Sequence, residues 1–252
     1  MTAGPVLFAR YAYPPNALGL CGADETRTLL EYGSAGVSDG GLSQLARTFE
    51  GAWPYLELIA GSNRIADPLD PRVVEAYWVG NELLDRVSPG SLARHVEDRF
   101  RGRIGRTWSH LLDTVAAGAV PHHCFHVFAV YPWLGLLRTG IVDEPLRVLD
   151  LCRTTPALVA SVDGDALRVA LRPLRWNGSR LELGAWTTRM VRWRDDGLAM
   201  LAAPPSPGQW VSLHWDVACD RLTPQAAAAL ARATRRALRA VDTSSSALAA
   251  LA

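Results

Sequence analysis

The sequence predicts an α+β protein in which a mainly α-helical domain is followed by a small β-barrel and a C-terminal helix. Over residues 24–114, apolar residues recur at spacings of three and four, which is typical of amphipathic helices. Over residues 157–215, short alternating runs are separated by turn pairs, which favours a small antiparallel sheet. After Thr223 the helical spacing returns. We therefore expect a helical domain over 1–145, a barrel with its helix over 146–242, and a flexible tail over 243–252.

The composition is that of an ordinary globular protein. The chain has 252 residues, of which 49% are hydrophobic and 20% charged, and this is enough for two modest domains with their own cores. The net charge of +1 provides no broad basic surface, so nucleic acid is not an expected partner. All 26 basic residues are arginines, which excludes a lysine Schiff base.

The chain shows neither a secretion signal nor a membrane span. The N-terminus lacks a basic segment followed by an apolar one, and no run approaches the roughly 18 apolar residues that a span needs. We therefore expect a cytoplasmic protein. The four cysteines are scattered without a Cys-x-x-Cys pair, which favours free thiols, metal ligands or core residues over disulfides.

The first half of the chain contains several helix starts. Residues 1–22 are rich in proline, glycine and aromatic residues, and we expect them to be irregular. Beyond them, Asp and Ser residues precede apolar periodic segments as N-caps do, and proline suits a first helical turn. Helices are expected to begin at Asp24, at Ser38 or Asp39, at Trp53-Pro54, at Asp70-Pro71 and at Ser91, with a further helix over 104–115.

The segment 121–137 is dense in histidine and aromatic residues and can be interpreted in two ways. It is either a buried strand followed by a turn or a helix broken at Pro132, and its periodicity does not decide between them.

Turn residues divide the second half into strands. Asp163-Gly164-Asp165 and Asn177-Gly178 each separate two β-rich runs, which predicts two hairpins. A further strand is expected over 187–193, and the run 210–215 is expected to be the last strand. Short strands with tight turns fit a small OB-like barrel, and Thr223-Pro224 then opens the C-terminal helix.

Three motifs follow one another in this half of the chain. A Cys-x-x-x-Pro motif at Cys152 precedes the first hairpin, a Gly-Gln-aromatic-Val strand ends at His214, and a final helix follows. In this order the motifs resemble the HypC/HupF family of NiFe-hydrogenase assembly chaperones. The helical half contains runs, HCFHVFAVYPWLGLLR among them, that resemble an uncharacterised bacterial family associated with NiFe-hydrogenase gene clusters.

The resemblance implies an accessory protein rather than an enzyme. In HypC-like proteins, the cysteine and histidine that match Cys152 and His214 are implicated in holding iron with its cyanide and carbonyl ligands. The implied partners are the hydrogenase large subunit or other maturation proteins. A thiolate suits low-spin iron, and an imidazole can complete such a site. The alternative is that both residues belong to the core.

A second set of candidate metal ligands is His122, Cys124 and His126. In an extended segment these three side chains share one face and His123 points away, whereas in a helix His122 and His126 are four residues apart and can bind one metal. This cluster indicates a metal- or haem-binding enzyme as the rival function. A buried segment with structural histidines is the other interpretation.

Two further groups of residues are candidates for binding. The first group could line a pocket, because loops carry much binding chemistry, or could form an arm packed across the helical domain. It consists of Arg10, Tyr11, Tyr13, Asn16 and Cys21. The second consists of Trp186 and Trp193, which could anchor a partner in a purely protein-binding module.

Overall fold

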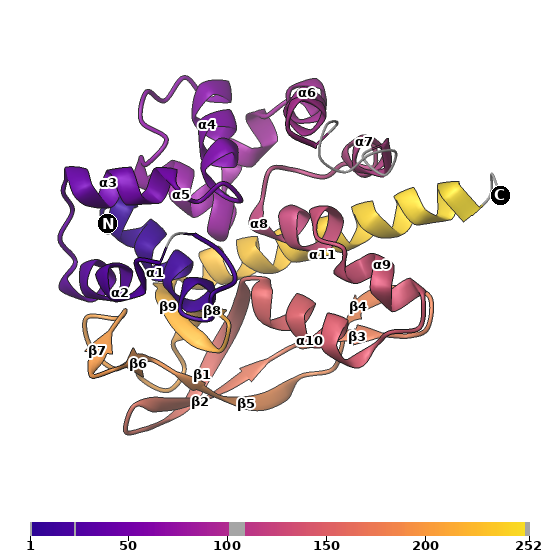
Figure 1. Ribbon diagram of the computed structural model, residues 1–252. Helices are drawn as coiled ribbons and strands as arrows, with labels where there is room; N and C mark the ends of the chain where they lie inside the picture. The colour runs from indigo at the N-terminus through magenta and orange to yellow at the C-terminus, as the bar shows by residue number, and fades with distance from the viewer. Residues whose placement is uncertain (1, 23, 101–108, 250–252) are drawn as a thin grey trace.

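The structure is a computed structural model that describes residues 2–22, 24–100 and 109–249. Figure 1 shows the helices of the first half above the barrel of the second half, with the long C-terminal helix α11 (Pro224–Ala249) running between them. This arrangement confirms the predicted α+β class, with an α-helical N-terminal part followed by a small barrel and a helix.

Up to residue 116, the described part of the helical half forms seven α-helices and one 3-10 helix. Their bounds are α1 (Gly4–Asn16), α2 (Thr26–Ala35), α3 (Gly40–Arg47), α4 (Trp53–Ser62), α5 (Pro71–Trp78), η1 (Glu82–Arg86), α6 (Pro89–Phe100) and α7 (Ser109–Ala116).

Side-chain caps explain several of these helix starts. The carboxylate of Asp39 accepts the amide of Leu42 at 2.9 Å before α3, and Asp70 caps α5, so both predicted caps are confirmed. Helix α6 begins earlier than expected, because Ser88 rather than Ser91 supplies the capping hydroxyl. Residues 104–108 of the last predicted helix lie outside the described residues, and α7 begins at Ser109.

The prediction that residues 1–22 are irregular was wrong. Helix α1 spans Gly4–Asn16, with Pro5 in the first turn and Pro14 and Pro15 in the last. Proline is tolerated in a first turn but removes a backbone hydrogen bond later in a helix. Most of α1 is buried, so packing against its neighbours compensates for the bonds that the two later prolines remove.

The histidine-rich segment adopts the helical alternative. It forms α8 (His123–Phe125), the π-helical turn η3 (His126–Val130) and, after a break at Tyr131 and Pro132, α9 (Trp133–Arg138). Helix α10 (Asp143–Cys152) follows and leads into the first strand, so the expected boundary between residues 145 and 146 falls inside a helix.

Five strands close a barrel in the order β1-β2-β5-β9-β8. Both predicted hairpins are confirmed: β1 pairs with β2 around Gly164, and the separate pair β3-β4 turns at Asn177-Gly178. The bounds are β1 (Thr155–Asp163), β2 (Ala166–Leu171), β3 (Leu174–Trp176), β4 (Leu181–Leu183), β5 (Thr187–Arg192), β6 (Arg194–Asp195), β7 (Leu198–Ala199), β8 (Trp210–His214) and β9 (Val217–Leu222).

The expectation that the run 210–215 is the last strand was wrong, because β9 follows β8 after a two-residue turn. Trp215 and Asp216 have φ values of 51° and 57°, the left-handed conformation of a type I′ hairpin turn. Neither residue is the glycine or asparagine that usually marks such a turn, so the sequence carried no clear signal for it. Strand β9 completes the closed barrel.

Two hydrophobic clusters form the interior. The smaller lies inside the barrel and includes Trp193, whose indole donates to the carbonyl of Gly164 at 2.9 Å. Trp193 is therefore buried and was wrongly expected as an exposed anchor, whereas Trp186 is exposed. The larger cluster joins the helical half to α10, α11 and the outer side of the barrel, so the two halves share one core. Helix α11 continues through the predicted tail to Ala249.

Candidate functional site

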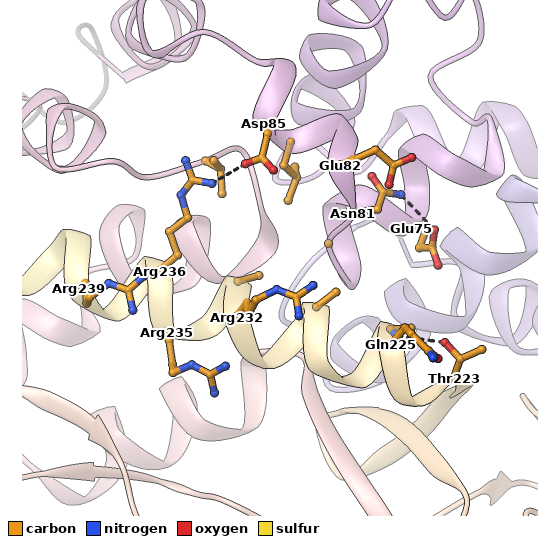
Figure 2. A pocket seen from close by; sticks show the side chains of 16 residues that line it. Glu75, Asn81, Glu82, Asp85, Thr223, Gln225, Arg232, Arg235, Arg236 and Arg239 are labelled. Atoms are coloured by element: carbon orange, nitrogen blue, oxygen red, sulfur yellow. Dashed lines mark hydrogen bonds and ion pairs between the residues drawn. The ribbon is translucent and has the colours of Figure 1, made fainter.

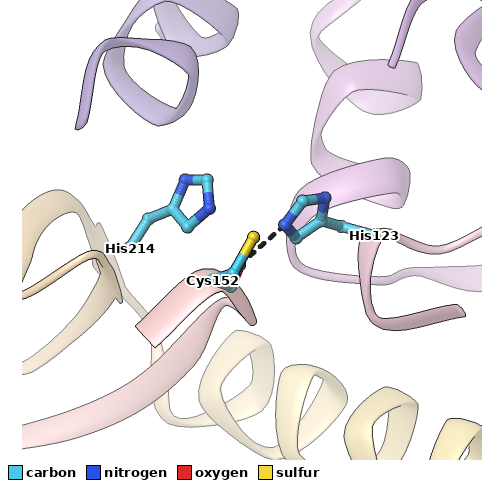
Figure 3. Close-up of side chains that lie close together, drawn as sticks. All are labelled: His123, Cys152 and His214. Carbon is cyan, nitrogen blue, oxygen red and sulfur yellow. Dashed lines mark hydrogen bonds between the residues drawn. The ribbon is translucent and has the colours of Figure 1, made fainter. Parts of the chain in front are cut away.

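Three potential metal ligands from distant parts of the chain meet between the helical half and the barrel. Among the described residues, His123, Cys152 and His214 form the group whose donor atoms all lie within 4.8 Å of one another (Figure 3). His123 begins α8, Cys152 ends α10 and His214 ends β8. All three side chains are buried.

Strand pairing brings Cys152 and His214 together. In the antiparallel pair β1-β8, Thr155 lies opposite Leu213, so the chain before β1 runs beside the chain after β8. The amide of Trp215 donates to the carbonyl of Leu151 at 2.8 Å and joins the end of β8 to the last turn of α10. The sequence prediction that this cysteine and this histidine face one another agrees with this geometry.

A backbone carbonyl sets the orientation of His214. Its Nδ1 lies 2.7 Å from the carbonyl oxygen of Tyr11, which can only accept, so Nδ1 carries the proton and Nε2 carries the lone pair. Nε2 is buried and has no hydrogen-bond partner of good geometry among the described residues. Because Pro15 has no N–H to offer the Tyr11 carbonyl, that oxygen is free to receive the imidazole.

His123 is held from both sides. Its Nε2 donates to the carbonyl of Cys152 at 2.8 Å, and its Nδ1 lies 3.3 Å from the hydroxyl of Tyr77. The lone pair is therefore on Nδ1, which can bind a metal once the tyrosine hydroxyl turns away toward the carbonyl of Gly51, 3.2 Å from it. The ring of Trp78 packs against both histidines, with centroid distances of 4.5 Å to His123 and 5.5 Å to His214.

The three donors line a cavity of about 200 Å³. Its remaining walls are largely apolar and aromatic, with Phe49, Tyr131 and Trp133 among them. No Asp, Glu or Arg belongs to its described lining, whereas the thiol-bearing residue Cys21 does. The cavity therefore combines a few polar donors with a low-polarity wall, as binding sites for small ligands do.

Burial keeps the donors neutral. It lowers the pKa of His214 to about 4, and together with the neighbouring His214 it lowers that of His123 well below the usual range. Burial raises the pKa of the Cys152 thiol to about 12, and the nearby Cys21 thiol adds to the rise. At neutral pH the site thus holds two neutral imidazoles, each with a lone pair on one nitrogen, and a thiol that would lose its proton when a metal ion binds.

The donor set suits a transition metal. One thiolate with two imidazoles binds zinc, copper or iron, and carbonyl groups fix both rings from outside as they do at metal centres. In tetrahedral sites with bonds of roughly 2.0–2.3 Å, neighbouring donors lie about 3.5 Å apart. The present limit of 4.8 Å requires only small side-chain movements to reach that spacing.

The predicted ligand set His122, Cys124 and His126 is not among the groups that converge within this distance in the described chain. The imidazole of His122 instead accepts the amide of Cys124 as a helix cap, at 3.0 Å. The Cys124 thiol lies 3.7 Å from the hydroxyl of Thr234, and His126 lies 3.3 Å from that of Tyr55. Of the three, only His126 lines the cavity.

Among the pocket candidates near the N-terminus, Cys21 is the one that lines the cavity. Arg10 forms an ion pair with Asp220 at 3.5 Å, and the hydroxyls of Tyr11 and Tyr13 bond to Ser212 and Asp195. Asn16 donates to the carbonyl of Cys21 at 2.8 Å. Arg10 and Tyr11 thus join α1 to the barrel strands β9 and β8, whereas Tyr13 bonds to β6 and Asn16 to the loop after α1.

Sequence reasoning passed over His123, the third donor. In an extended segment it points away from its neighbours, and in a helix it lacks a partner at the spacing that His122 and His126 have. Its ring meets Cys152 and His214 only because α8 packs between α5 and the end of α10. No local pattern in the sequence signals that contact.

A larger groove of about 710 Å³ runs along α11 (Figure 2). Arginines of α11 face acidic residues of the helical half across it, and Arg236 pairs with Asp85 at 2.8 Å. Neither histidine nor cysteine belongs to its described lining. It carries charges of both signs without a converging donor set, so we place the candidate site in the smaller cavity.

Residues 1–247 match the model of a family of unknown function, DUF6390, and the chain belongs to that family. The chain matched neither a curated protein nor a solved structure. None of the described helices combines the length and the apolar character that crossing a membrane would require.

Proposed function

We propose that this protein is a metal-binding accessory protein in the assembly of NiFe hydrogenases, and that His123, Cys152 and His214 hold the metal. The observation that carries the proposal is the meeting of three donors in one cavity, where the Tyr11 carbonyl holds the proton of His214 on Nδ1 and leaves the lone pair on Nε2. An unpartnered buried nitrogen is costly unless a ligand satisfies it, which favours a bound ion.

The HypC resemblance supports the hydrogenase part of the proposal. The two motifs that carry it end on paired strands, with Cys152 just before β1 and His214 at the end of β8. A small barrel followed by a helix agrees with the fold that the resemblance implies. Cys152 is internal here, so the metal site uses a side-chain thiol, with the carbonyl of the same residue orienting His123.

A metal-dependent enzyme is the second candidate. Three protein donors leave one coordination position open, which is the arrangement of catalytic metal sites, and the cavity beside them has room for a small molecule. An enzyme would turn over a substrate as the isolated loaded protein, whereas an accessory protein acts only together with its client.

Cobalt binding tests the metal site. We expect the protein, freed of metal by a chelator, to bind about one equivalent of Co²⁺ with a thiolate-to-cobalt charge-transfer band. Cys152→Ser should abolish that band or sharply reduce it, and His214→Ala should weaken binding by at least about tenfold, because each removes a ligand. Absorption titration measures both effects.

Cys124→Ser is the matched control, since its buried side chain lies outside the cavity beside Thr234. It should leave the cobalt spectrum unchanged. If Cys124→Ser loses the cobalt spectrum and Cys152→Ser keeps it, the metal is bound by the cluster of His122, Cys124 and His126. That result would contradict the assignment.

The assembly role is tested in cells that mature a NiFe hydrogenase. Replacing the protein with its Cys152→Ala variant should abolish hydrogenase activity while the variant still accumulates as folded protein. Normal hydrogenase activity in that strain would refute the proposed role, even if the purified protein binds metal.

A further inference from the structure

Cys21 lies in the wall of the same cavity as the three donors. We propose that Cys21 is the fourth metal ligand, which makes the site a set of two thiolates and two imidazoles. This inference rests on the proposed metal site. It goes beyond the HypC resemblance, which covers only the second half of the chain, because Cys21 belongs to the helical half.

The loop that carries Cys21 is fixed to the end of α1. The side-chain amide of Asn16 donates to the Cys21 carbonyl at 2.8 Å, and the amide of Leu20 donates to the Pro15 carbonyl at 3.0 Å. Gly22 closes the loop with a φ of 83°, and a Cβ there would lie 2.5 Å from the ring of Phe49. The loop thus packs against Phe49 in the cavity wall, and the Cys21 side chain is half-buried.

Charge balance favours a second thiolate. A divalent ion bound by one thiolate and two neutral imidazoles keeps a net charge of +1, and a buried, unpaired charge is costly. The described cavity wall offers no carboxylate to neutralise it. Deprotonated Cys21 would make the bound centre neutral, and it is the lining residue that can supply this charge most readily.

The coordination step balances without any redox reagent. Two S–H bonds are broken and two metal–sulfur bonds form, while two protons leave to solvent and both imidazoles bind through existing lone pairs. The thiol of Cys21 is not within 4.8 Å of all three other donors. Coordination therefore requires rotation about its Cα–Cβ bond or a small movement of the loop.

The cobalt experiment counts the thiolates. In the full-length protein, we expect a charge-transfer band that falls to about half in Cys21→Ser, with Co²⁺ still bound by the other three ligands. Proton release per cobalt, followed with a pH indicator in weak buffer, should drop from about two to about one. The affinity should fall by about tenfold or more.

Gly22→Ala provides a second test that leaves both thiols in place. Because the added Cβ would meet Phe49 and alanine disfavours a φ of 83°, the loop must shift, and we expect the shift to disturb the position of Cys21. We expect the charge-transfer band of Gly22→Ala to lie between those of the unaltered protein and of Cys21→Ser. The double variant that carries both substitutions should show the same band as Cys21→Ser alone. Cys124→Ser again serves as the control.

The outcomes separate this inference from the metal site itself. If the unaltered protein binds no Co²⁺, the proposed function fails. If it binds Co²⁺ with one thiolate, one proton released and a spectrum that Cys21→Ser leaves unchanged, the three-ligand site stands and Cys21 is not a ligand.

Discussion

At the scale of single residues, backbone carbonyls decide what the site histidines can do. The Tyr11 carbonyl accepts a hydrogen bond from Nδ1–H of His214, and the Cys152 carbonyl accepts one from Nε2–H of His123. Each ring is thereby fixed in one tautomer with its lone pair on the opposite nitrogen. Because burial disfavours the charged imidazolium, both rings stay neutral and able to bind a cation.

The same burial predicts that the protein loses stability in mild acid. Burial lowers the pKa of His122 and His214 to about 4 and that of His126 to about 3, whereas an unfolded histidine titrates near 6.5. Between these values the unfolded chain binds more protons, so the free energy of unfolding falls as pH drops from about 6.5 toward 4. Each such histidine contributes a loss on the order of 2–3 kcal/mol.

Urea unfolding of the metal-free protein at several pH values between 7.5 and 4.5 measures this slope. His122→Asn is the matched variant, because asparagine can still cap α8 but does not titrate. In this variant, unfolding in mild acid should take up about one proton fewer, so the free energy of unfolding should change less steeply with pH. An identical slope in the variant would mean that His122 is protonated in the folded state.

At the scale of elements, helix α1 links the helical half to the barrel and contributes to the site. It supplies the carbonyl of Tyr11, the hydroxyl that bonds Ser212 at 2.6 Å, and the end from which the Cys21 loop departs. Its first residue, Gly4, lies against the backbone of Leu69, where a Cβ would come within 1.7 Å of a carbonyl oxygen. The position of α1 therefore depends on a glycine there.

Two identical substitutions should consequently have opposite effects on stability. Gly4→Ala places a methyl group into the Leu69 carbonyl and should destabilise the fold by about 2 kcal/mol or more. Gly61→Ala, in α4, meets open space and should stabilise it by up to about 1 kcal/mol, because alanine favours the helix. Thermal unfolding of both variants tests the pair, and a neutral Gly4→Ala would show that α1 can shift freely.

At the scale of the whole molecule, the helical half and the barrel share one hydrophobic core. The larger hydrophobic cluster includes residues of α1, α5, α10 and α11 together with Leu174, Trp215 and Cys219 from the barrel side. Helix α11 packs on α7 and α8 as well as on β1 and β8. Removing either half would expose the apolar surface of the other to water.

We therefore expect one unfolding transition for the full chain, with far-ultraviolet circular dichroism and tryptophan fluorescence giving the same midpoint. The segment 146–252 alone should not fold cooperatively, because its share of the common core would be exposed. Two separate transitions, or a stable isolated segment, would contradict the shared core.

Local patterns were sufficient for much of the fold. The Asp39 and Asp70 caps, the turn at Gly164 and the Asn177-Gly178 hairpin were predictable, because each depends on residues within a few positions. Helix α1 and strand β9 were not. In α1 burial outweighs two prolines, and the Trp215-Asp216 turn adopts a left-handed backbone without the residues that usually signal it.

The site divides in the same way. The pairing of Cys152 with His214 was expected from the HypC resemblance, whose two motifs flank strands β1 and β8, and these strands pair in the structure. His123 and Cys21 join them only in the folded chain, since α8 and the loop after α1 reach the cavity through packing between elements far apart in sequence. Spacing along a chain reports neighbours within a helix or hairpin, whereas the contacts that complete this cavity depend on burying a shared apolar core.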